Sequence, residues 1–189
     1  MKIDNVHMLG LYDSVRASKF PMAVDTTECD YCPTDRQDRL AAAERGSGHD
    51  QFLTGIIVQF DLTFSNKAWV ELQRYHFIDF VSSQSTMHRA TRMDVRKQVN
   101  EYVDDIIVDR LQELIAQYNA NQTPENYLKV VYNIPSGYQL TARLTTNYRQ
   151  LKTIYAQRKT HRLPEWREFC GWIESLPFAK WITGKEEQQ

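Results

Sequence analysis

The stretch from Pro135 to Trp166 reads PSGYQLTARLTTNYRQLKTIYAQRKTHRLPEW, which predicts a turn, a strand and a helix in that order. The proline, serine and glycine at its start are typical of a turn, and the threonine-rich run 138–146 has strand composition. Asn147 follows as the expected N-cap of a helix that places Arg158 on one face. Because a helix N-terminus offers free N–H groups to an anion, this junction predicts polar groups directed at a ligand.

Two interpretations of this junction stay open at the level of residue pattern. In the first, Asn147 and Arg158 contact a bound ligand. In the second, Asn147 only caps the helix and Arg158 is a solvated helix arginine. The residue pattern is compatible with both interpretations and does not distinguish a ligand-binding junction from a structural one.

Length, charge and hydropathy restrict the class of protein. The 189 residues are 42% hydrophobic, which is enough for one core, so we expect one domain over 1–180 and a flexible tail over 181–189. A net charge of −1 gives no basic field, so general nucleic-acid binding is not expected. The chain lacks a run of about 18 apolar residues and begins without a signal-peptide core, which predicts a soluble cytoplasmic protein and no membrane partner.

The three cysteines do not form a disulfide framework. Cys29 and Cys32 make a single Cys-x-x-Cys pair in a polar loop, whereas a structural zinc ion normally has four ligands. His7 or His49 would have to complete such a site through folding or from a neighbouring subunit, so we predict a loop without metal. Cys170 lies in an apolar helical segment and is predicted to be core, because no basic partner for a catalytic thiol is evident.

Periodicity along the chain predicts a mixture of strands and helices. Alternating apolar residues predict strands over 2–9 and 51–64. Helices are predicted after an N-cap at Asn66, over 93–118 as one long helix or two joined ones, over 123–132, and from Pro164 onward. This order of elements is typical of the α+β class.

The junction resembles the second conserved region of the flavin-dependent thymidylate synthases, also called thymidylate synthase complementing proteins. The residues that carry this resemblance are Ile134-Pro135, Thr141, Asn147-x-Arg149-x-Leu151, Arg158 and Glu165-Trp166-Arg167. Earlier segments also occur in the family's order, namely Ser14 to Ala17, a short helix from Arg36 to Arg45 ending at Gly46, Gly48-His49, and a strand over 56–60. The resemblance spans nearly the whole chain and implies that family's fold, a mixed sheet with long helices.

The resemblance also implies an activity and roles for particular residues. The family methylates dUMP to dTMP, with carbon from methylenetetrahydrofolate, hydride from reduced FAD and NADPH as reductant, and it uses neither a cysteine nucleophile nor a metal. Its members are homotetramers whose sites are built from several subunits. By resemblance, Arg158 would hold and polarise the pyrimidine, Asn147, Arg74 and His76 would bind the flavin cofactor, and Ser85 and Arg149 would bind the nucleotide.

The family's signature motif corresponds to residues 73–89, which read QRYHFIDFVSSQSTMHR. Counting from His49 without gaps places Arg74 on the motif's first arginine, whereas aligning His76 with its histidine places Ser85 on its second serine. The motif's Asn-Glu pair is absent in both registers, so we expect flavin to bind more weakly than in a typical member. Arg74 and His76 are equally compatible with structural roles among the aromatic residues, and the alternative function is a non-catalytic nucleotide-binding homologue.

Overall fold

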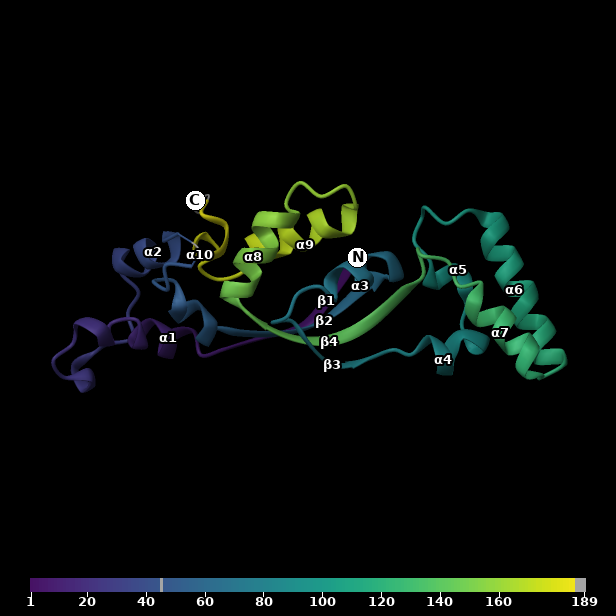
Figure 1. Cartoon of the computed structure of the whole chain (residues 1–189), viewed down its shortest axis with the longest axis horizontal. Coiled ribbons are helices and arrows are strands. Elements are labelled where there is room, and N and C mark those ends of the chain that lie inside the picture. Colours follow the sequence, from purple (N-terminus) through teal and green to yellow (C-terminus); the bar gives the residue numbers. More distant parts are fainter. Residues whose placement is uncertain (45, 186–189) are drawn as a thin grey trace. The chain divides into compact units, whose positions relative to one another are not determined.

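A computed structural model of the chain describes residues 1–44 and 46–185 (Figure 1). Arg45, the predicted end of one helix, and residues 186–189 of the predicted tail lie outside the described residues. Within the described part, four strands form a sheet in the order β1 (Lys2–Leu9), β2 (Ile57–Ser65), β4 (Gln139–Asn147) and β3 (Asp79–Ser83). Helices accompany this sheet, so the predicted α+β class is confirmed.

The α-helices are α1 (Leu11–Ala17), α2 (Asp35–Ala42), α3 (Asn66–Leu72), α4 (Thr86–Arg89), α5 (Val95–Gln98), α6 (Asp105–Ala120), α7 (Pro124–Tyr132), α8 (Tyr148–Arg158), α9 (Pro164–Glu174) and α10 (Lys180–Thr183). Short 3₁₀ helices occur at η1 (Phe20–Met22), η2 (Thr26–Glu28), η3 (Gln51–Gly55) and η4 (Ala90–Arg92). None of the helices in the described residues is long and apolar enough to cross a membrane.

The register of β2 against β4 follows from three side-chain contacts on one face of the sheet. Gln59 Nε2 donates to Thr145 Oγ1 at 3.1 Å, Arg143 pairs with Asp61 at 3.2 Å, and the hydroxyls of Thr63 and Thr141 lie 2.7 Å apart. One residue number rises by two as the other falls by two, so this pair of strands is antiparallel. The resemblance implied a mixed sheet, whereas this central pair of strands is antiparallel.

The opposite face of these two strands is apolar and buried. Every second residue of β2 from Val58 to Phe64 is fully buried, and Leu144 of β4 is fully buried as well. The rings of Phe169 and Trp172 on α9 lie 5.9 Å and 4.7 Å from the ring of Phe60, measured between centroids. This two-residue alternation is why the sequence predicted strands here.

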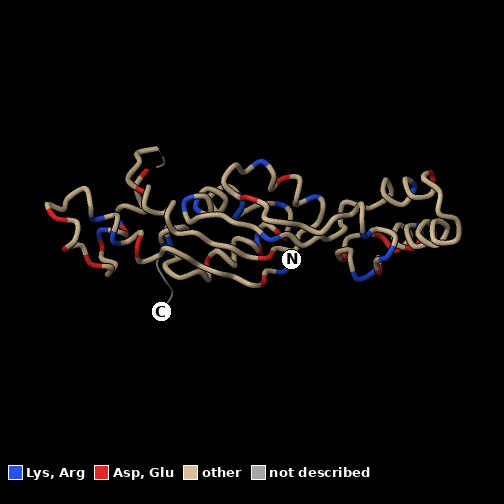
Figure 2. The backbone as a smooth tube through the Cα atoms, turned by 90° about the horizontal axis from the view of Figure 1, so that it is seen from below, with Lys and Arg blue, Asp and Glu red and all other residues tan. Residues whose placement is uncertain are grey.

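The described chain divides into two compact units. Unit 1 comprises residues 1–3, 61–74 and 80–143, and unit 2 comprises residues 4–60, 75–79 and 144 onward. The core of unit 1 lies around α5, α6 and α7, with buried Val95, Val108, Leu111, Leu114 and Val130. Unit 2 contains α1, α2 and α8 to α10 and holds every residue of the cavities described below. Figure 2 shows that acidic and basic residues are interspersed along the backbone.

Several predicted boundaries differ from the structure. The first part of the predicted strand 51–64 is the 3₁₀ helix η3, because a short apolar run does not distinguish strand from helix. The cap of α3 is Ser65, whose Oγ accepts a hydrogen bond from the N–H of Ala68, and not Asn66. The sequence predicted one long helix or two joined ones over 93–118, and the structure has two helices, α5 and α6. They are separated because Val99 pairs with Tyr138 and the chain leaves the helical path until Asp104 caps α6.

The C-terminal end carries a further helix that the sequence did not predict. In α10, Trp181 and Ile182 are buried, and Trp181 Nε1 donates to Asp38 Oδ1 at 2.7 Å. Lys180 forms an ion pair with the same carboxylate at 2.8 Å. The chain is therefore packed against α2 at residues 180–182, beyond the start of the predicted tail at 181.

The N-terminus of α1 packs closely against η3 at two glycines. Gly10 has a φ of +73°, and a Cβ atom there would lie 2.5 Å from the backbone oxygen of Gly55. A Cβ on Gly55 would in turn lie 2.4 Å from the hydroxyl of Ser14. The contact between the two segments therefore depends on the absence of side chains at both positions.

We predict that Gly10→Ala lowers the free energy of unfolding by about 1–3 kcal/mol, because it adds a clash with backbone to an unfavourable φ. Gly171→Ala is the matched control. Gly171 lies within α9, nothing lies within 4 Å of its added Cβ, and alanine there should stabilise the helix by about 1 kcal/mol. Urea unfolding of both variants measures the difference, and a neutral Gly10→Ala would contradict the packing.

Candidate functional site

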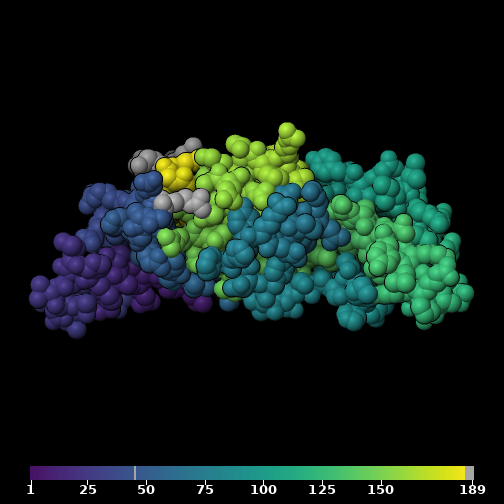
Figure 3. Space-filling model, in the orientation of Figure 1, coloured from purple at the N-terminus to yellow at the C-terminus, as the bar shows by residue number. Residues whose placement is uncertain are grey.

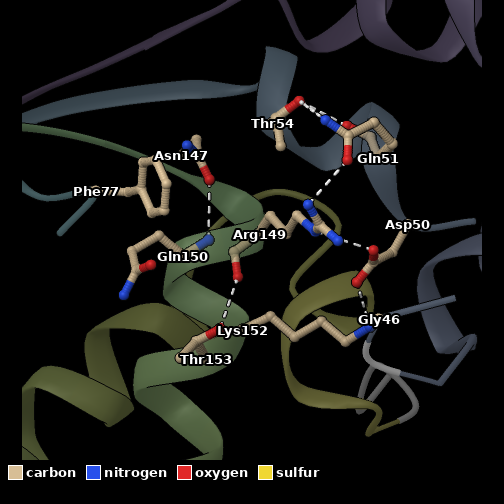
Figure 4. A pocket seen from close by; sticks show the side chains of 10 residues that line it. All are labelled: Gly46, Asp50, Gln51, Thr54, Phe77, Asn147, Arg149, Gln150, Lys152 and Thr153. Carbon is tan, nitrogen blue, oxygen red and sulfur yellow. Dashed lines mark hydrogen bonds and ion pairs between the residues drawn. The ribbon is translucent and has the colours of Figure 1, made fainter. Parts of the chain in front are cut away.

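A cavity of about 340 Å³ lies beside the first turns of α8, in unit 2 (Figure 4). One wall comes from α8 and the end of β4, and another comes from η3 and the segment that leads into it. Its lining residues are Gly46, Asp50, Gln51, Thr54, Phe77, Asn147, Arg149, Gln150, Lys152 and Thr153. The lining is rich in hydrogen-bond donors, as the predicted strand-to-helix junction requires.

Asn147 has the capping role that the sequence predicted. Its Oδ1 accepts a hydrogen bond from the N–H of Gln150 at 2.9 Å, which satisfies a backbone donor in the first turn of α8. The cap leaves the side-chain amide Nδ2 without a hydrogen bond to any residue that the structure describes. Since Asn147 also lines the cavity, one side chain can both cap the helix and offer a donor to a ligand.

Arg149 and Lys152 share one buried carboxylate. They stand three residues apart on α8, so they lie on the same side of that helix. Arg149 Nε pairs with Asp50 Oδ1 at 3.0 Å and Lys152 Nζ pairs with Asp50 Oδ2 at 3.1 Å, and the two side chains converge in Figure 4. Asp50 is only 2% exposed. Two cationic side chains pair with one carboxylate, so Asp50, Arg149 and Lys152 together carry an excess positive charge at the cavity wall.

Further hydrogen bonds hold both cations in place. Arg149 Nη1 donates to Gln51 Oε1 at 2.8 Å, and Lys152 Nζ also donates to the carbonyl oxygen of Ala41 at 2.6 Å. The second contact joins α8 to the C-terminal end of α2. Sequence reasoning missed Asp50 and Lys152, because a lone aspartate after His49 and a lysine on a helix show no pattern that separates them from surface residues.

Arg158, at the end of α8, is held by aromatic residues. Its Nε donates to the hydroxyl of Tyr75 at 2.9 Å, and that hydroxyl donates to Gln157 Oε1 at 2.9 Å. The guanidinium carbon lies 4.6 Å from the centroid of the Trp166 indole, at a distance typical of a cation–π contact. These contacts fix the orientation of Arg158, which is therefore not freely solvated. Arg158 is not among the residues that line the cavity of Figure 4.

The other predicted site residues lie elsewhere. Arg74 and His76 are exposed, and Ser85 is half-buried just before α4 without a side-chain capping bond. Arg74 and Ser85 belong to unit 1, whereas His76 belongs to unit 2 with Asn147, Arg149 and Arg158. Of the six predicted residues, the cavity lining contains Asn147 and Arg149. The roles of all six residues toward ligands stay predictions.

The cysteines have two different environments. Cys170 is buried, and burial together with the nearby Glu174 carboxylate raises the pKa of its thiol to about 11, so it is core, as predicted. The loop with Cys29 and Cys32 is held through its backbone. Arg16 donates to the carbonyl oxygen of Cys29 at 3.1 Å, and Lys19 donates to that of Cys32 at 2.8 Å.

We predict that Asn147→Ala lowers the free energy of unfolding by about 1 kcal/mol, because the cap of α8 is lost. Asn147→Asp is the matched control, since a carboxylate oxygen caps as well as an amide oxygen and the stability should stay near that of the wild type. Thermal or urea unfolding measures both. Equal stability of the alanine variant and the wild type would show that the 2.9 Å bond to Gln150 contributes nothing.

No protein-family model matches the sequence, and comparison with curated proteins gave no match. Comparison with solved structures gave clear matches. Two structures of the flavin-dependent thymidylate synthase from Helicobacter pylori, each in complex with FAD and dUMP, share 16% and 17% sequence identity with this chain. The TM-scores are 0.76 and 0.77, and each match covers 97% of both chains.

Because each match covers 97% of both chains, the similarity includes the sheet and the helices and is not confined to one shared motif. Identity at this level supports the fold and leaves the chemistry to the site residues. The match between structures indicates the same fold that the sequence resemblance around Asn147 implied. This chain has the fold of the flavin-dependent thymidylate synthases.

Proposed function

We propose that this chain is a divergent flavin-dependent thymidylate synthase-like protein that methylates dUMP to dTMP, with reduced FAD and methylenetetrahydrofolate as co-reactants and NADPH as reductant. The observation that carries the proposal is the cavity at the start of α8, which lies in a fold whose solved relatives are complexes with FAD and dUMP. The cavity contains Asn147 and Arg149, which the resemblance assigns to cofactor and nucleotide.

The residues around the cavity fit an anionic ligand with an aromatic part. Arg149 and Lys152 supply an excess positive charge, Asn147 supplies an amide donor, and the aromatic ring of Phe77 is part of the lining. A volume of about 340 Å³ lies within the range of small-molecule sites, which is roughly 300–1,000 Å³. These residues suit a phosphate-bearing cofactor or nucleotide. The resemblance also assigns Arg74 and His76 to the flavin.

Arg158 is the residue that we assign to the pyrimidine. A guanidinium stays charged and presents a planar fork of donors, which suits a ring with two carbonyl oxygens. The hydrogen bond to Tyr75 and the contact with Trp166 fix the orientation of this fork before any ligand arrives. Bound FAD would supply the hydride chemistry, while Asn147, Arg149 and Arg158 would bind and orient the two ligands. The resemblance assigns Ser85 to the nucleotide as well.

A non-catalytic nucleotide-binding homologue is the second candidate. It is favoured by the segment 73–89, which lacks the Asn-Glu pair of the family's signature, and by the exposure of Arg74 and His76. In this second function the nucleotide would bind at the cavity and at Arg158 without flavin chemistry.

We further propose a homotetramer. The edge strand β3 is exposed along its whole length, including Phe80 and Val81. Apolar side chains are also exposed on α6 and α7, whose surface is visible in Figure 3, namely Ile106, Ile107, Leu128 and Tyr132. Uncovered edge strands and apolar patches are typical of protein–protein interfaces.

We predict that the purified protein binds dUMP and that Arg158→Ala weakens this binding about ten- to a hundredfold, which is the usual effect of losing a hydrogen bond to a charged group. Arg162→Ala is the matched control, because it removes the same charge from an exposed residue nearby. Calorimetry with dUMP measures both variants. Equal affinities of Arg158→Ala and the wild type would remove Arg158 from the site.

Flavin separates the two candidate functions. We expect FAD to bind more weakly than in a typical family member and dTMP to form slowly in a single-turnover assay with dUMP, methylenetetrahydrofolate and reduced FAD. Asn147→Asp, which keeps the cap, should weaken FAD binding because it replaces the amide donor with a carboxylate. Binding of dUMP without FAD would favour the non-catalytic homologue, and binding of neither would contradict both functions.

We predict a tetramer in light scattering at micromolar concentration, and a smaller species for Val81→Asp, because a buried unpaired carboxylate in the interface is unfavourable. Val24→Asp is the control, since Val24 is fully exposed in the other unit and its change should leave the tetramer intact. A monomeric wild type would contradict the assembly.

A further inference from the structure

An exposed aromatic ring, that of Phe77, lies on the lining of the cavity in Figure 4, which is called the first cavity below. Phe77 stands in the turn that precedes β3, in unit 2, and it is 67% exposed. Among the described residues that line the first cavity it is the only aromatic one. Its ring forms no contact with another aromatic ring of the described chain, so no aromatic side chain of the protein stacks on it.

The backbone of Phe77 is held in place, although its ring is exposed. The hydroxyl of Thr146, a buried residue near the end of β4, donates to the carbonyl oxygen of Phe77 at 2.8 Å. The next residue along the chain, Ile78, is only 4% exposed. Because Thr146 immediately precedes the helix cap Asn147, the hydrogen bond keeps Phe77 beside the start of α8.

Donors for an anion lie on the same lining, apart from Phe77. Arg149 uses Nε for Asp50 and Nη1 for Gln51, which leaves its Nη2 without a hydrogen bond to any residue that the structure describes. In Figure 4 the ring of Phe77 lies away from the paired charges at Asp50, on the other side of Asn147 in the view. The lining therefore offers an aromatic surface in one place and charged donors in another.

The combination of these features is what points to a ligand. A single exposed aromatic side chain is ordinary on a protein surface and indicates nothing by itself. An aromatic ring beside cationic donors suits a phosphate that carries a flat heterocycle, because the protein ring stacks on the heterocycle and the cations bind the phosphate. Stacking of this kind depends on the flat face of the side chain, and an aliphatic side chain of similar size lacks that face.

We propose that Phe77 stacks on a flat heteroaromatic ring of the flavin cofactor, and that it makes the first cavity prefer phosphates that carry such a ring. This inference rests on the proposed function, in which Asn147 of the same lining binds FAD. FAD has two flat rings, the isoalloxazine and the adenine, and both are linked to its phosphates. Either ring would stack on Phe77 while a phosphate contacts Arg149.

The test is titration of FAD into the full-length protein and into three variants at position 77. We expect Phe77→Ala to weaken FAD binding about five- to a hundredfold, which is the usual effect of losing one stacked aromatic side chain. Phe77→Leu should also weaken it, because leucine keeps the apolar bulk and lacks the flat face. Phe77→Trp should retain the affinity and should quench the fluorescence of the bound flavin through direct contact.

Smaller probes identify the ring that Phe77 contacts. FMN carries the isoalloxazine and AMP carries the adenine, each with one phosphate, so the probe that Phe77→Ala weakens contains the stacked ring. Ribose 5-phosphate has a phosphate and no aromatic ring, and it should bind the wild type at least tenfold more weakly than that probe.

Tyr12→Ala is the matched control. Tyr12 is an aromatic residue of unit 2 that is 55% exposed and lies outside the lining of the first cavity, so its loss should leave FAD binding unchanged. Urea unfolding and light scattering should give the same stability and assembly for Phe77→Ala and the wild type. The reason is that the ring is exposed and the hydrogen bond from Thr146 goes to the backbone.

The outcomes separate this inference from the proposed function. Equal FAD affinity of Phe77→Ala and the wild type would overturn the role of Phe77 and leave the flavin function standing. Wild-type affinity in Phe77→Leu would overturn stacking, since apolar bulk alone would then suffice. A changed assembly of Phe77→Ala with unchanged FAD affinity would assign the ring to an interface between copies and overturn the inference. A wild type that binds none of FAD, FMN and AMP would contradict both the flavin function and the role of Phe77.

Discussion

The pairing of the buried Asp50 carboxylate with two cations is the interaction on which the first cavity of this structure depends. This carboxylate accepts from Arg149 and Lys152 of α8, and it belongs to the segment that continues into η3. Burying one charge is unfavourable unless its partners are held in good geometry, and here Gln51 and the carbonyl oxygen of Ala41 hold the two partners. This network fixes the distance between α8 and η3, and the first cavity lies between them.

The helix η3 also lines a second cavity, of about 560 Å³, whose other walls come from α1, η1 and α2. Gln51 and Thr54 line both cavities, and the close contact of Gly55 with α1 sets the far wall of the second one. The two cavities nevertheless differ in chemistry. The charges of the first cavity are paired by Asp50, whereas the lining of the second cavity combines apolar side chains with Ser14, Ser18, Arg36, His49, Gln51 and Thr54.

At the junction of β4 and α8, the side chain of Asn147 caps the helix and also lines the first cavity. Asn147 caps through its oxygen, which leaves its nitrogen for the cavity. Arg158, at the other end of α8, is oriented by Tyr75 and Trp166, so its position is determined before a ligand binds. Preorganised donors of this kind lose little conformational entropy on binding. The fixed orientation of Arg158 supports the role toward a pyrimidine that we propose for it.

The sequence by itself determined the elements whose signals are local. The alternation in β2 and β4, the caps at Asn147 and Thr123, and the apolar environment of Cys170 were all predictable, because each depends on neighbours in the chain. The resemblance around Asn147 and Arg149 also indicated the fold. Only the tertiary structure decided that Asp50 lies between Arg149 and Lys152, that Tyr75 reaches Arg158, and that α10 packs on α2. These contacts join residues from 83 to 143 positions apart, and no local pattern of hydropathy or charge records which distant partner a side chain will meet.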